Sequence, residues 1–204
     1  DVCSSDLGDG MGSHRMVTKQ VSFYEEITNV PFIIAGPGIH PRQKPVEDLL
    51  TQPTIDLLPT LCELAGIPVP SSKPGISLAP FLKGEKQKRQ HPYAASEWHS
   101  EYEVTVSPGR MIRSPRYKYT HYLEGNGEEL YDMLKDKGER RNLAHDPKYS
   151  KILAEHRALL DDYIHRTQDD YRSLKVEADK RWRSHAPGYP NHEGPCARDI
   201  INRK

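Results

Sequence analysis

The sequence predicts an α/β domain followed by a small α+β subdomain. A continuous apolar run over residues 30–35 ends in Gly-Pro-Gly, which is typical of a strand covered on both faces of its sheet. Residues 54–65 have the apolar spacing of a helix. Farther along, an alternating aromatic strand over 117–122 precedes an amphipathic helix over 152–164. That order is expected for an antiparallel sheet with a helix across it.

The first part of the chain opens with a glycine-rich stretch. Residues 8–20 mix glycine with polar residues and predict a loop. Ser22, with Glu25 three residues later, predicts the capped start of a short helix over 22–27. The next helix is expected to end at Gly66, because glycine favours the left-handed conformation of a carboxy-terminal cap.

The second part alternates short strands with turns and then changes to a helix. Strands are predicted over 93–98, 110–113, 117–122 and 129–133. Asp146-Pro147 predicts the start of the final helix. The polar residues after it are expected to form an extended tail. The predicted boundaries are therefore 1–89 for the α/β part, 90–168 for the α+β subdomain and 169–204 for the tail.

Composition limits the classes of function. Lys+Arg and Asp+Glu number 29 each and are interspersed, so no basic stripe predicts nucleic-acid binding. No apolar run is long enough to span a membrane. Three cysteines, Cys3, Cys62 and Cys196, are widely spaced and predict neither a disulfide framework nor a C-x-x-C metal pair. Cys62 lies on an apolar helix face and is expected in the core.

Polar side chains suited to ion binding gather near the start of the chain. Asp6 and Asp9 supply carboxylates, His14 an imidazole and Lys19 an ammonium. Aspartate binds hard cations such as calcium, and lysine offsets negative charge that develops on an anion. Aspartate is also a common turn residue in glycine-rich loops, and we expect that role for Asp9.

The order of the motifs resembles the sulfatase family of the alkaline-phosphatase-like superfamily. The first matches are Ser5-Asp6-Leu7-Gly8-Asp9, Gly12-Ser13-His14, Lys19, Ser22-Phe23-Tyr24-Glu25-Glu26 and Val30 to Gly38. Later matches are Thr54 to Leu61 with Ala65-Gly66-Ile67, Gly75-Ile76-Ser77-Leu78 with Pro80-Phe81-Leu82, Lys118-Tyr119, Glu129 to Asp132, Glu139 and Asn142-Leu143. The resemblance covers residues 5–165. It implies that 1–89 is the carboxy-terminal remnant of an alkaline-phosphatase-like α/β/α catalytic domain.

The resemblance implies roles for individual residues. Asp6 matches the aspartate that binds the divalent metal, usually calcium. Lys19 matches the lysine that binds the sulfate oxygens, where it would act as a catalytic residue. Leu7 stands where the family has His or Asn, and leucine cannot ligate a metal.

Three further residues are expected near the substrate. His14 lies close to Lys19 in the sequence and is a candidate to face the pocket, although an imidazole in such a loop is as often structural. Trp98 and His99, beside Glu97, are expected to border the substrate pocket of the whole enzyme.

The activity implied by the resemblance is hydrolysis of a sulfate ester on a sulfated carbohydrate or another alcohol. The family nucleophile is a formylglycine, made from Cys or Ser in a Cys/Ser-x-Pro/Ala-x-Arg motif. None of the three cysteines supplies that motif, so we expect the formylglycine in an upstream segment. The chain is therefore interpreted as a carboxy-terminal fragment of a sulfatase that is inactive alone.

Two other functions stay open at this point. One is a phosphonate or phosphate ester hydrolase of the same superfamily, because a fold does not fix the reaction. The other is a noncatalytic carbohydrate-binding module, for which Trp98 and the strand over 117–122 would supply aromatic surface. The first residues, DVCSSDL, match one translated reading frame of a common sequencing-library adapter. We therefore expect the natural sequence to begin at Gly8 and the chain to have lost its beginning.

Overall fold

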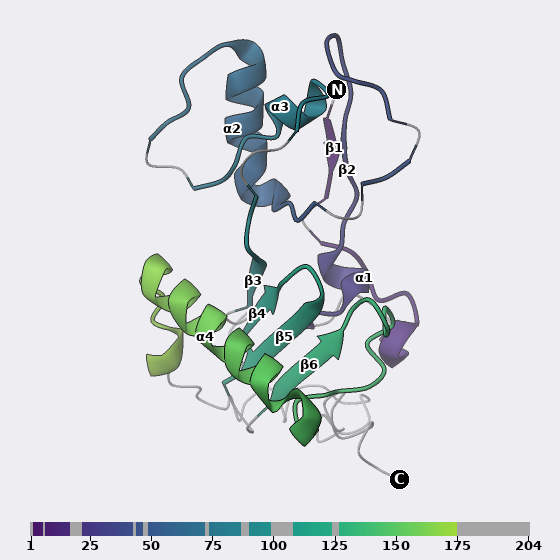
Figure 1. The fold of residues 1–204 in the computed structure, drawn as a ribbon, viewed down its shortest axis with the longest axis vertical. Coiled ribbons are helices and arrows are strands. Elements are labelled where there is room, and N and C mark those ends of the chain that lie inside the picture. The colour runs from purple at the N-terminus through teal and green to yellow at the C-terminus, as the bar shows by residue number, and fades with distance from the viewer. Residues whose placement is uncertain are drawn as a thin grey trace, which may run out of the picture.

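The computed structural model describes residues 2–5, 7–16, 22–42, 44–46, 49–71, 74–86, 90–98, 108–123 and 127–174. They form an upper and a lower unit (Figure 1). The upper unit contains strands β1 (Val2–Ser4) and β2 (Phe32–Ile34) and helices α2 (Pro53–Ala65) and α3 (Ala79–Leu82). The lower unit contains α1 (Glu25–Thr28), β3 (Ala94–Trp98), β4 (Gly109–Arg113), β5 (Tyr117–Tyr122), β6 (Glu128–Asp132) and α4 (Ser150–Thr167).

The lower unit is the antiparallel sheet and helix that the sequence predicts. Its strands pair in the order β3-β4-β5-β6, each antiparallel to the next. Alternate residues of the sheet, among them Ile112, Tyr119 and Leu130, are at most 1% exposed and form one core with α4. From α4, Leu153 and Leu160 pack into that core. The alternation of the strands and the apolar stripe of the helix therefore meet in one interface.

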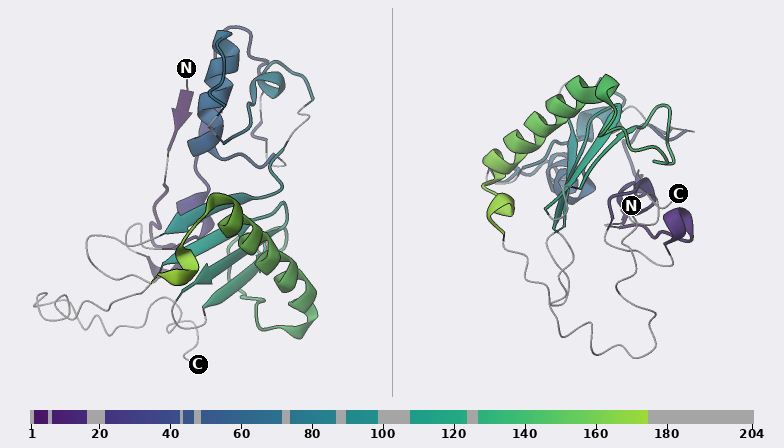
Figure 2. Two further views of the ribbon diagram at one scale, coloured as in Figure 1. Left: turned by 90° about the vertical axis from the view of Figure 1, so that its left-hand side faces the viewer. Right: turned by 90° about the horizontal axis from the view of Figure 1, so that it is seen from below.

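The opposite face of the sheet is covered by residues from the start of the chain. Phe23 packs with Met111 and Tyr122, and Tyr24 lies in a second cluster with Tyr131. In the view from below, the segment with α1 and the helix α4 lie on opposite sides of the sheet (Figure 2). The start of the chain thus packs across the predicted boundary at residue 89.

Polar side chains of α2 fix the segment that leads to α3. Asp56 is fully buried and accepts the N–H of Ile76 at 2.8 Å, and His91 Nε2 lies 2.8 Å from the same carboxylate. Thr60 Oγ1 accepts the N–H of Leu78 at 3.0 Å. These contacts give a physical reason for two of the motifs, because the helix supplies acceptors for backbone donors of the Gly-Ile-Ser-Leu segment.

The sequence predicted the end of one helix correctly and the start of another wrongly. Gly66 ends α2 with a φ of 70°, and the predicted core residue Cys62 is 6% exposed. Ser22 does not cap α1, which begins at Glu25 and has no side-chain cap from its own N-cap residue. The N–H of Glu25 instead donates to the Glu139 carboxylate at 2.7 Å. The acceptor for this free N–H of the first helical turn therefore comes from a residue 114 positions away in the sequence.

Within the described chain, the strand predicted over residues 30–35 is not buried on both faces. The observed strand β2 is shorter and pairs with β1 in a two-stranded antiparallel sheet. Ile33 at its centre is 59% exposed. An apolar run shows only the tendency to be buried, whereas burial needs a layer on each face, and the described residues do not supply both layers.

The end of the lower unit also differs from the predicted tail. Asp169 accepts two hydrogen bonds from Arg110, at 2.6 and 2.9 Å. Tyr171, in the 3₁₀ helix η3 (Tyr171–Ser173), is fully buried beneath the same guanidinium. Residues 169–174 are therefore part of the packed unit rather than an extended tail, and residues 175–204 lie outside the described residues.

None of the helices in the described part of the chain combines the length and the apolar composition needed to cross a bilayer.

The buried histidine of α4 predicts a pH dependence of stability. His156 is 5% exposed, with Nδ1 2.8 Å from the Ile152 carbonyl and Nε2 2.9 Å from Ser114 Oγ. Burial lowers the pKa of His156 and outweighs the hydrogen bond to Ile152 that favours the charged ring. The unfolded chain then binds more protons, so this contribution is present above about pH 6.5 and is lost as the pH falls toward the folded pKa.

We therefore expect a lower urea midpoint at pH 5.5 than at pH 7.5, and a smaller difference in a His156→Gln variant. His145 is exposed, so His145→Gln is the matched control and should keep the full difference. Urea titrations followed by circular dichroism measure both midpoints. An equal pH difference in the native chain and the His156→Gln variant would contradict the assignment.

Candidate active site

The glycine-rich segment over residues 8–16 is fixed on the lower unit by close backbone contacts. The Gly8 N–H donates to the carbonyl of Ile27 at 2.8 Å. A Cβ on Gly8 would lie 1.8 Å from the Glu26 carbonyl oxygen, so only glycine fits there. Asp9 Oδ1 accepts the N–H of Met11 at 3.1 Å, which confirms its expected role in a turn.

His14 lies in the 3₁₀ helix η1 (Ser13–Arg15) in a conformation that is uncommon for a residue with a side chain. Its φ is 50°, in the left-handed region. The imidazole stacks on the ring of Tyr24, with centroids 3.7 Å apart, and its Nε2 lies 3.9 Å from the Glu26 carboxylate. Burial lowers the pKa of His14 despite the nearby negative charge, so the ring is mainly neutral at pH 7. Its predicted place at the substrate pocket stays a prediction.

Lys19 and Asp6, the predicted catalytic and metal-binding residues, lie outside the described residues. The structure does describe both sides of the segment that contains Lys19. Met16 is 2% exposed in the cluster with Tyr24, and the Ser22 hydroxyl donates to Met16 Sδ at 3.4 Å. The chain therefore enters and leaves residues 17–21 at adjacent, anchored points.

A buried ionic cluster, for which the sequence predicted no function, joins Phe23 and Glu25 to the sheet. Lys118 Nζ lies 2.8 Å from a carboxylate oxygen of Glu25 and 2.8 Å from one of Glu139. Burial raises the pKa of Glu139 more than the Lys118 charge lowers it. A sequence signal was available, because strand alternation places Lys118 on the face opposite Tyr117 and Tyr119.

Trp98, a predicted substrate residue, packs beside the same segment. Its ring contacts the cluster of Phe23, Met111 and Tyr122, and its carbonyl accepts a hydrogen bond from Arg110 at 2.8 Å. The buried indole N–H has no partner among the residues that the structure describes. His99 lies outside them. Trp98 thus packs against the cluster of Phe23, whereas His14 stacks on Tyr24, the next residue, which belongs to the other cluster.

The described residues do not form a calcium site. One ligand atom each of His14, Glu26 and Glu139 lies within 4.8 Å of the others. However, calcium prefers oxygen ligands, and the two oxygens of Glu139 already bind the Lys118 ammonium and the Glu25 N–H. Leu7 offers no donor atom, so these groups do not fit the ion.

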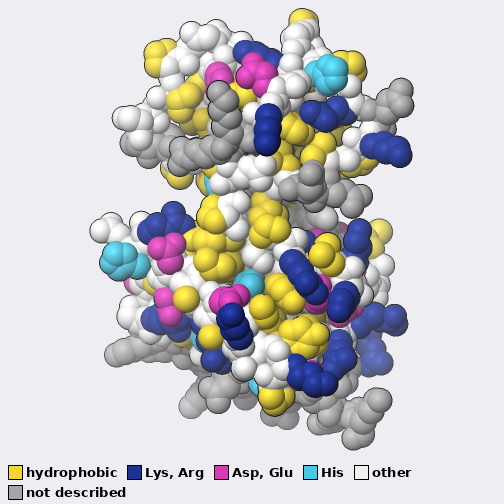
Figure 3. All heavy atoms as spheres, viewed as in Figure 1, with side chains coloured by type: hydrophobic (Ala, Val, Ile, Leu, Met, Phe, Trp, Pro, Cys, Tyr) yellow, Lys and Arg dark blue, Asp and Glu magenta, His cyan; other side chains and the backbone are white. Residues whose placement is uncertain are grey.

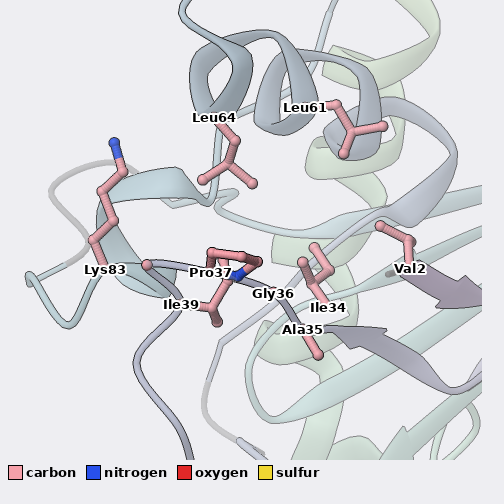
Figure 4. A pocket seen from close by; sticks show the side chains of 10 residues that line it. Val2, Ile34, Ala35, Gly36, Pro37, Ile39, Leu61, Leu64 and Lys83 are labelled. Carbon is pink, nitrogen blue, oxygen red and sulfur yellow. The ribbon is translucent and has the colours of Figure 1, made fainter.

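An apolar groove in the upper unit is a separate feature. Its volume is about 200 Å³, and Leu61 and Leu64 of α2 face Ile34 and Pro37 across it (Figure 4). Lys83 is the only charged residue of its lining. Apolar side chains are also exposed on the surface of this unit, as Figure 3 shows. The groove therefore lacks the convergent polar groups of a catalytic site.

Comparisons with known proteins agree with this fold. A solved structure of a 2-O GAG sulfatase superposes with a TM-score of 0.87 at 75% identity and covers 98% of this chain and 43% of that one. A phosphonate monoester hydrolase from Silicibacter pomeroyi superposes with a TM-score of 0.69 at 26% identity, covering 85% of this chain and 36% of that one. The fold is therefore that of the sulfatases and their alkaline-phosphatase-like relatives.

The family follows from the sequence match. Residues 12–166 match the family model described as N-sulphoglucosamine sulphohydrolase, C-terminal, and the chain belongs to that family of sulfatases. The Delta 4,5-hexuronate-2-O-sulfatase of Bacteroides thetaiotaomicron is 75% identical over 203 residues, which is 100% of this chain and 42% of that protein. The chain thus spans about two fifths of the length of this relative.

Proposed function

We propose that this chain is the carboxy-terminal part of a sulfuric ester hydrolase that acts on a sulfated carbohydrate, with a 2-O-sulfated hexuronate as the favoured substrate. The supporting observation is the 75% identity to a Delta 4,5-hexuronate-2-O-sulfatase along the chain. In the whole enzyme, the Lys19 ammonium would bind sulfate oxygens and offset the negative charge that develops in sulfuryl transfer. His14 would lie on the substrate side, where its neutral imidazole could exchange a proton.

The proposed calcium and formylglycine belong to the whole enzyme. Calcium would supply positive charge at the sulfate, with ligands from outside this chain; if residues 1–7 belong to the natural sequence, Asp6 would contribute one carboxylate to it. Trp98 and His99 are proposed to border the sugar. The exposed apolar residues of the upper unit, among them Ile33, Leu58 and Leu61, would pack against the remainder of the enzyme.

A second candidate, a phosphonate ester hydrolase, is favoured only by the structural similarity to the Silicibacter pomeroyi enzyme. The carbohydrate-binding module is disfavoured by the structure of β5. Tyr119 and Tyr122 are 1% and 9% exposed, and Tyr117 packs edge-on against His156. The strand therefore does not present the aromatic surface that such a module needs.

A hybrid enzyme tests the proposal. In it, the part of the Bacteroides thetaiotaomicron sulfatase that aligns with this chain is replaced by this chain. We expect the hybrid to release sulfate from an unsaturated 2-O-sulfated uronide disaccharide. The isolated chain, incubated with calcium and an aryl sulfate, should show no turnover above its Lys19→Ala variant.

Three outcomes separate the alternatives. Sulfate release by the hybrid supports the proposal, and cleavage of a matched phosphonate ester without sulfate release favours the second candidate. A folded hybrid that cleaves neither ester contradicts both enzyme functions. Turnover by the isolated native chain would contradict its expected inactivity.

A further inference from the structure

Lys118 is a buried cation surrounded by three oxygen atoms. Its side chain is 1% exposed. The ammonium donates to the Phe23 carbonyl at 2.7 Å and contacts carboxylate oxygens of Glu25 and Glu139 at 2.8 Å each. One contact is thus a hydrogen bond to a backbone carbonyl, and the other two are ion pairs. The three oxygen atoms come from two chain segments that are far apart in sequence.

Glu139 completes the cluster and joins it to the start of α1. One carboxylate oxygen binds Lys118, and the other accepts the N–H of Glu25 at 2.7 Å. Glu139 itself has a φ of 48°, a left-handed conformation that a residue with a side chain adopts at some cost. A second cation, Arg113, lies 3.8 Å from the Glu25 carboxylate. The direction in which the chain enters α1 is therefore fixed by charged contacts from the sheet and from the loop after β6.

A buried ionic cluster of this kind is weak evidence of a stabilising role. Removing charges from water costs free energy that their attraction often fails to recover, and apolar replacements of buried ion pairs are often neutral or stabilising. Two apolar clusters already attach this segment to the sheet, one through Phe23 and one through Tyr24. What the ionic cluster adds is direction, because hydrogen bonds constrain orientation more tightly than apolar contacts do.

Two of the residues that Lys118 contacts lie on either side of Tyr24, which stacks on His14, and close in sequence to Lys19. Ser22, which precedes Phe23, contacts Met16 on the other side of the segment that contains Lys19. Small displacements of this support would move groups that must meet the substrate within tenths of an ångström.

We propose that Lys118, through its contacts with Phe23, Glu25 and Glu139, is a positioning residue that sets the placement of His14 for sulfate-ester hydrolysis. The catalytic part of this proposal rests on the proposed function. The structural part, the fixing of residues 22–28 by Lys118, does not.

Two measurements test the two parts separately. In the hybrid enzyme, Lys118→Met should lower kcat by about 10- to 100-fold with a smaller change in KM, because the misplaced group acts in the transition state. Lys118→Arg keeps the charge and should recover part of the lost kcat. In the isolated chain, hydrogen exchange of peptides from residues 22–28 should be faster in Lys118→Met, with peptides of α4 unchanged. The exposed Lys135 gives the control Lys135→Met, which should match the native protein in both assays.

Glu139→Gln keeps the result interpretable if Lys118→Met does not fold. It leaves an amide oxygen for the Glu25 N–H but removes the charge beside Lys118, so a partial loss of kcat and faster exchange of residues 22–28 are expected. A Lys118→Met or Glu139→Gln hybrid with native kcat overturns the catalytic part, and unchanged exchange overturns the structural part. A native hybrid without sulfatase activity overturns the proposed function, whereas the exchange data still decide whether Lys118 holds the segment.

Discussion

Replacing Lys19 with alanine in the hybrid enzyme is expected to lower kcat for sulfate release by about 10²–10³-fold, the usual cost of losing one preorganised group that stabilises transition-state charge. The expectation rests on the anchored ends of its segment. Met16 is 2% exposed, and the Ser22 hydroxyl contacts Met16 Sδ at 3.4 Å. An ammonium beside the sulfate would offset the negative charge that develops on its oxygens.

The control for this variant is another lysine of the same chain. Lys44 is exposed and distant in sequence from the glycine-rich segment, so Lys44→Ala should keep kcat within about twofold. Initial rates over a range of substrate concentrations separate kcat from KM. A Lys19→Ala hybrid that loses only affinity would show that Lys19 binds substrate and transition state equally. Unchanged kcat and KM would remove Lys19 from the site.

Replacing Asp56 with alanine in this chain is expected to reduce the free energy of unfolding by about 3–5 kcal/mol, the typical cost of breaking a buried charged network. Its carboxylate is fully buried and accepts the N–H groups of Gln52 and Ile76 at 2.8 Å each. His91 Nε2 lies 2.8 Å from it. Alanine would leave these donors without the acceptor. The backbone at Gly75 packs so closely against α2 that a Cβ there would lie 2.1 Å from the Ile55 carbonyl oxygen. This segment therefore has little room to move when the carboxylate is removed.

Urea unfolding followed by circular dichroism measures this loss. Glu63 is an exposed acid on the same helix, and Glu63→Ala should change the free energy of unfolding by no more than about 0.5 kcal/mol. Asp56→Asn keeps one acceptor oxygen, so its free energy of unfolding should lie between those of Asp56→Ala and Glu63→Ala. Equal stability of the Asp56→Ala and Glu63→Ala variants would show that the contacts of Asp56 are replaced by water.

The sequence predicted β5, α4 and the end of α2 well because their signals are local. The alternation over 117–122, the apolar stripe over 152–164 and the left-handed Gly66 depend on neighbouring residues, and the structure confirms each of them. The start of α1 was predicted wrongly, because its cap comes from Glu139 rather than from Ser22. The burial predicted for both faces of the strand over 30–35 is also absent from the described chain, because the burial of a strand depends on the layers beside it.

Some residues of the candidate site were predictable from local sequence motifs, and others were identified only by their contacts in the structure. The motif order by itself determined the family and matched Lys19 and Asp6 to its site. Neighbouring positions in the sequence made His14, Trp98 and His99 further candidates. Only the tertiary structure showed that Lys118 meets Phe23, 95 residues earlier, and that Glu139 meets Glu25, 114 residues earlier. Periodicity and motif spacing act over a few residues, whereas a buried ion must find its partners in space, and chain folding alone decides which ones it meets.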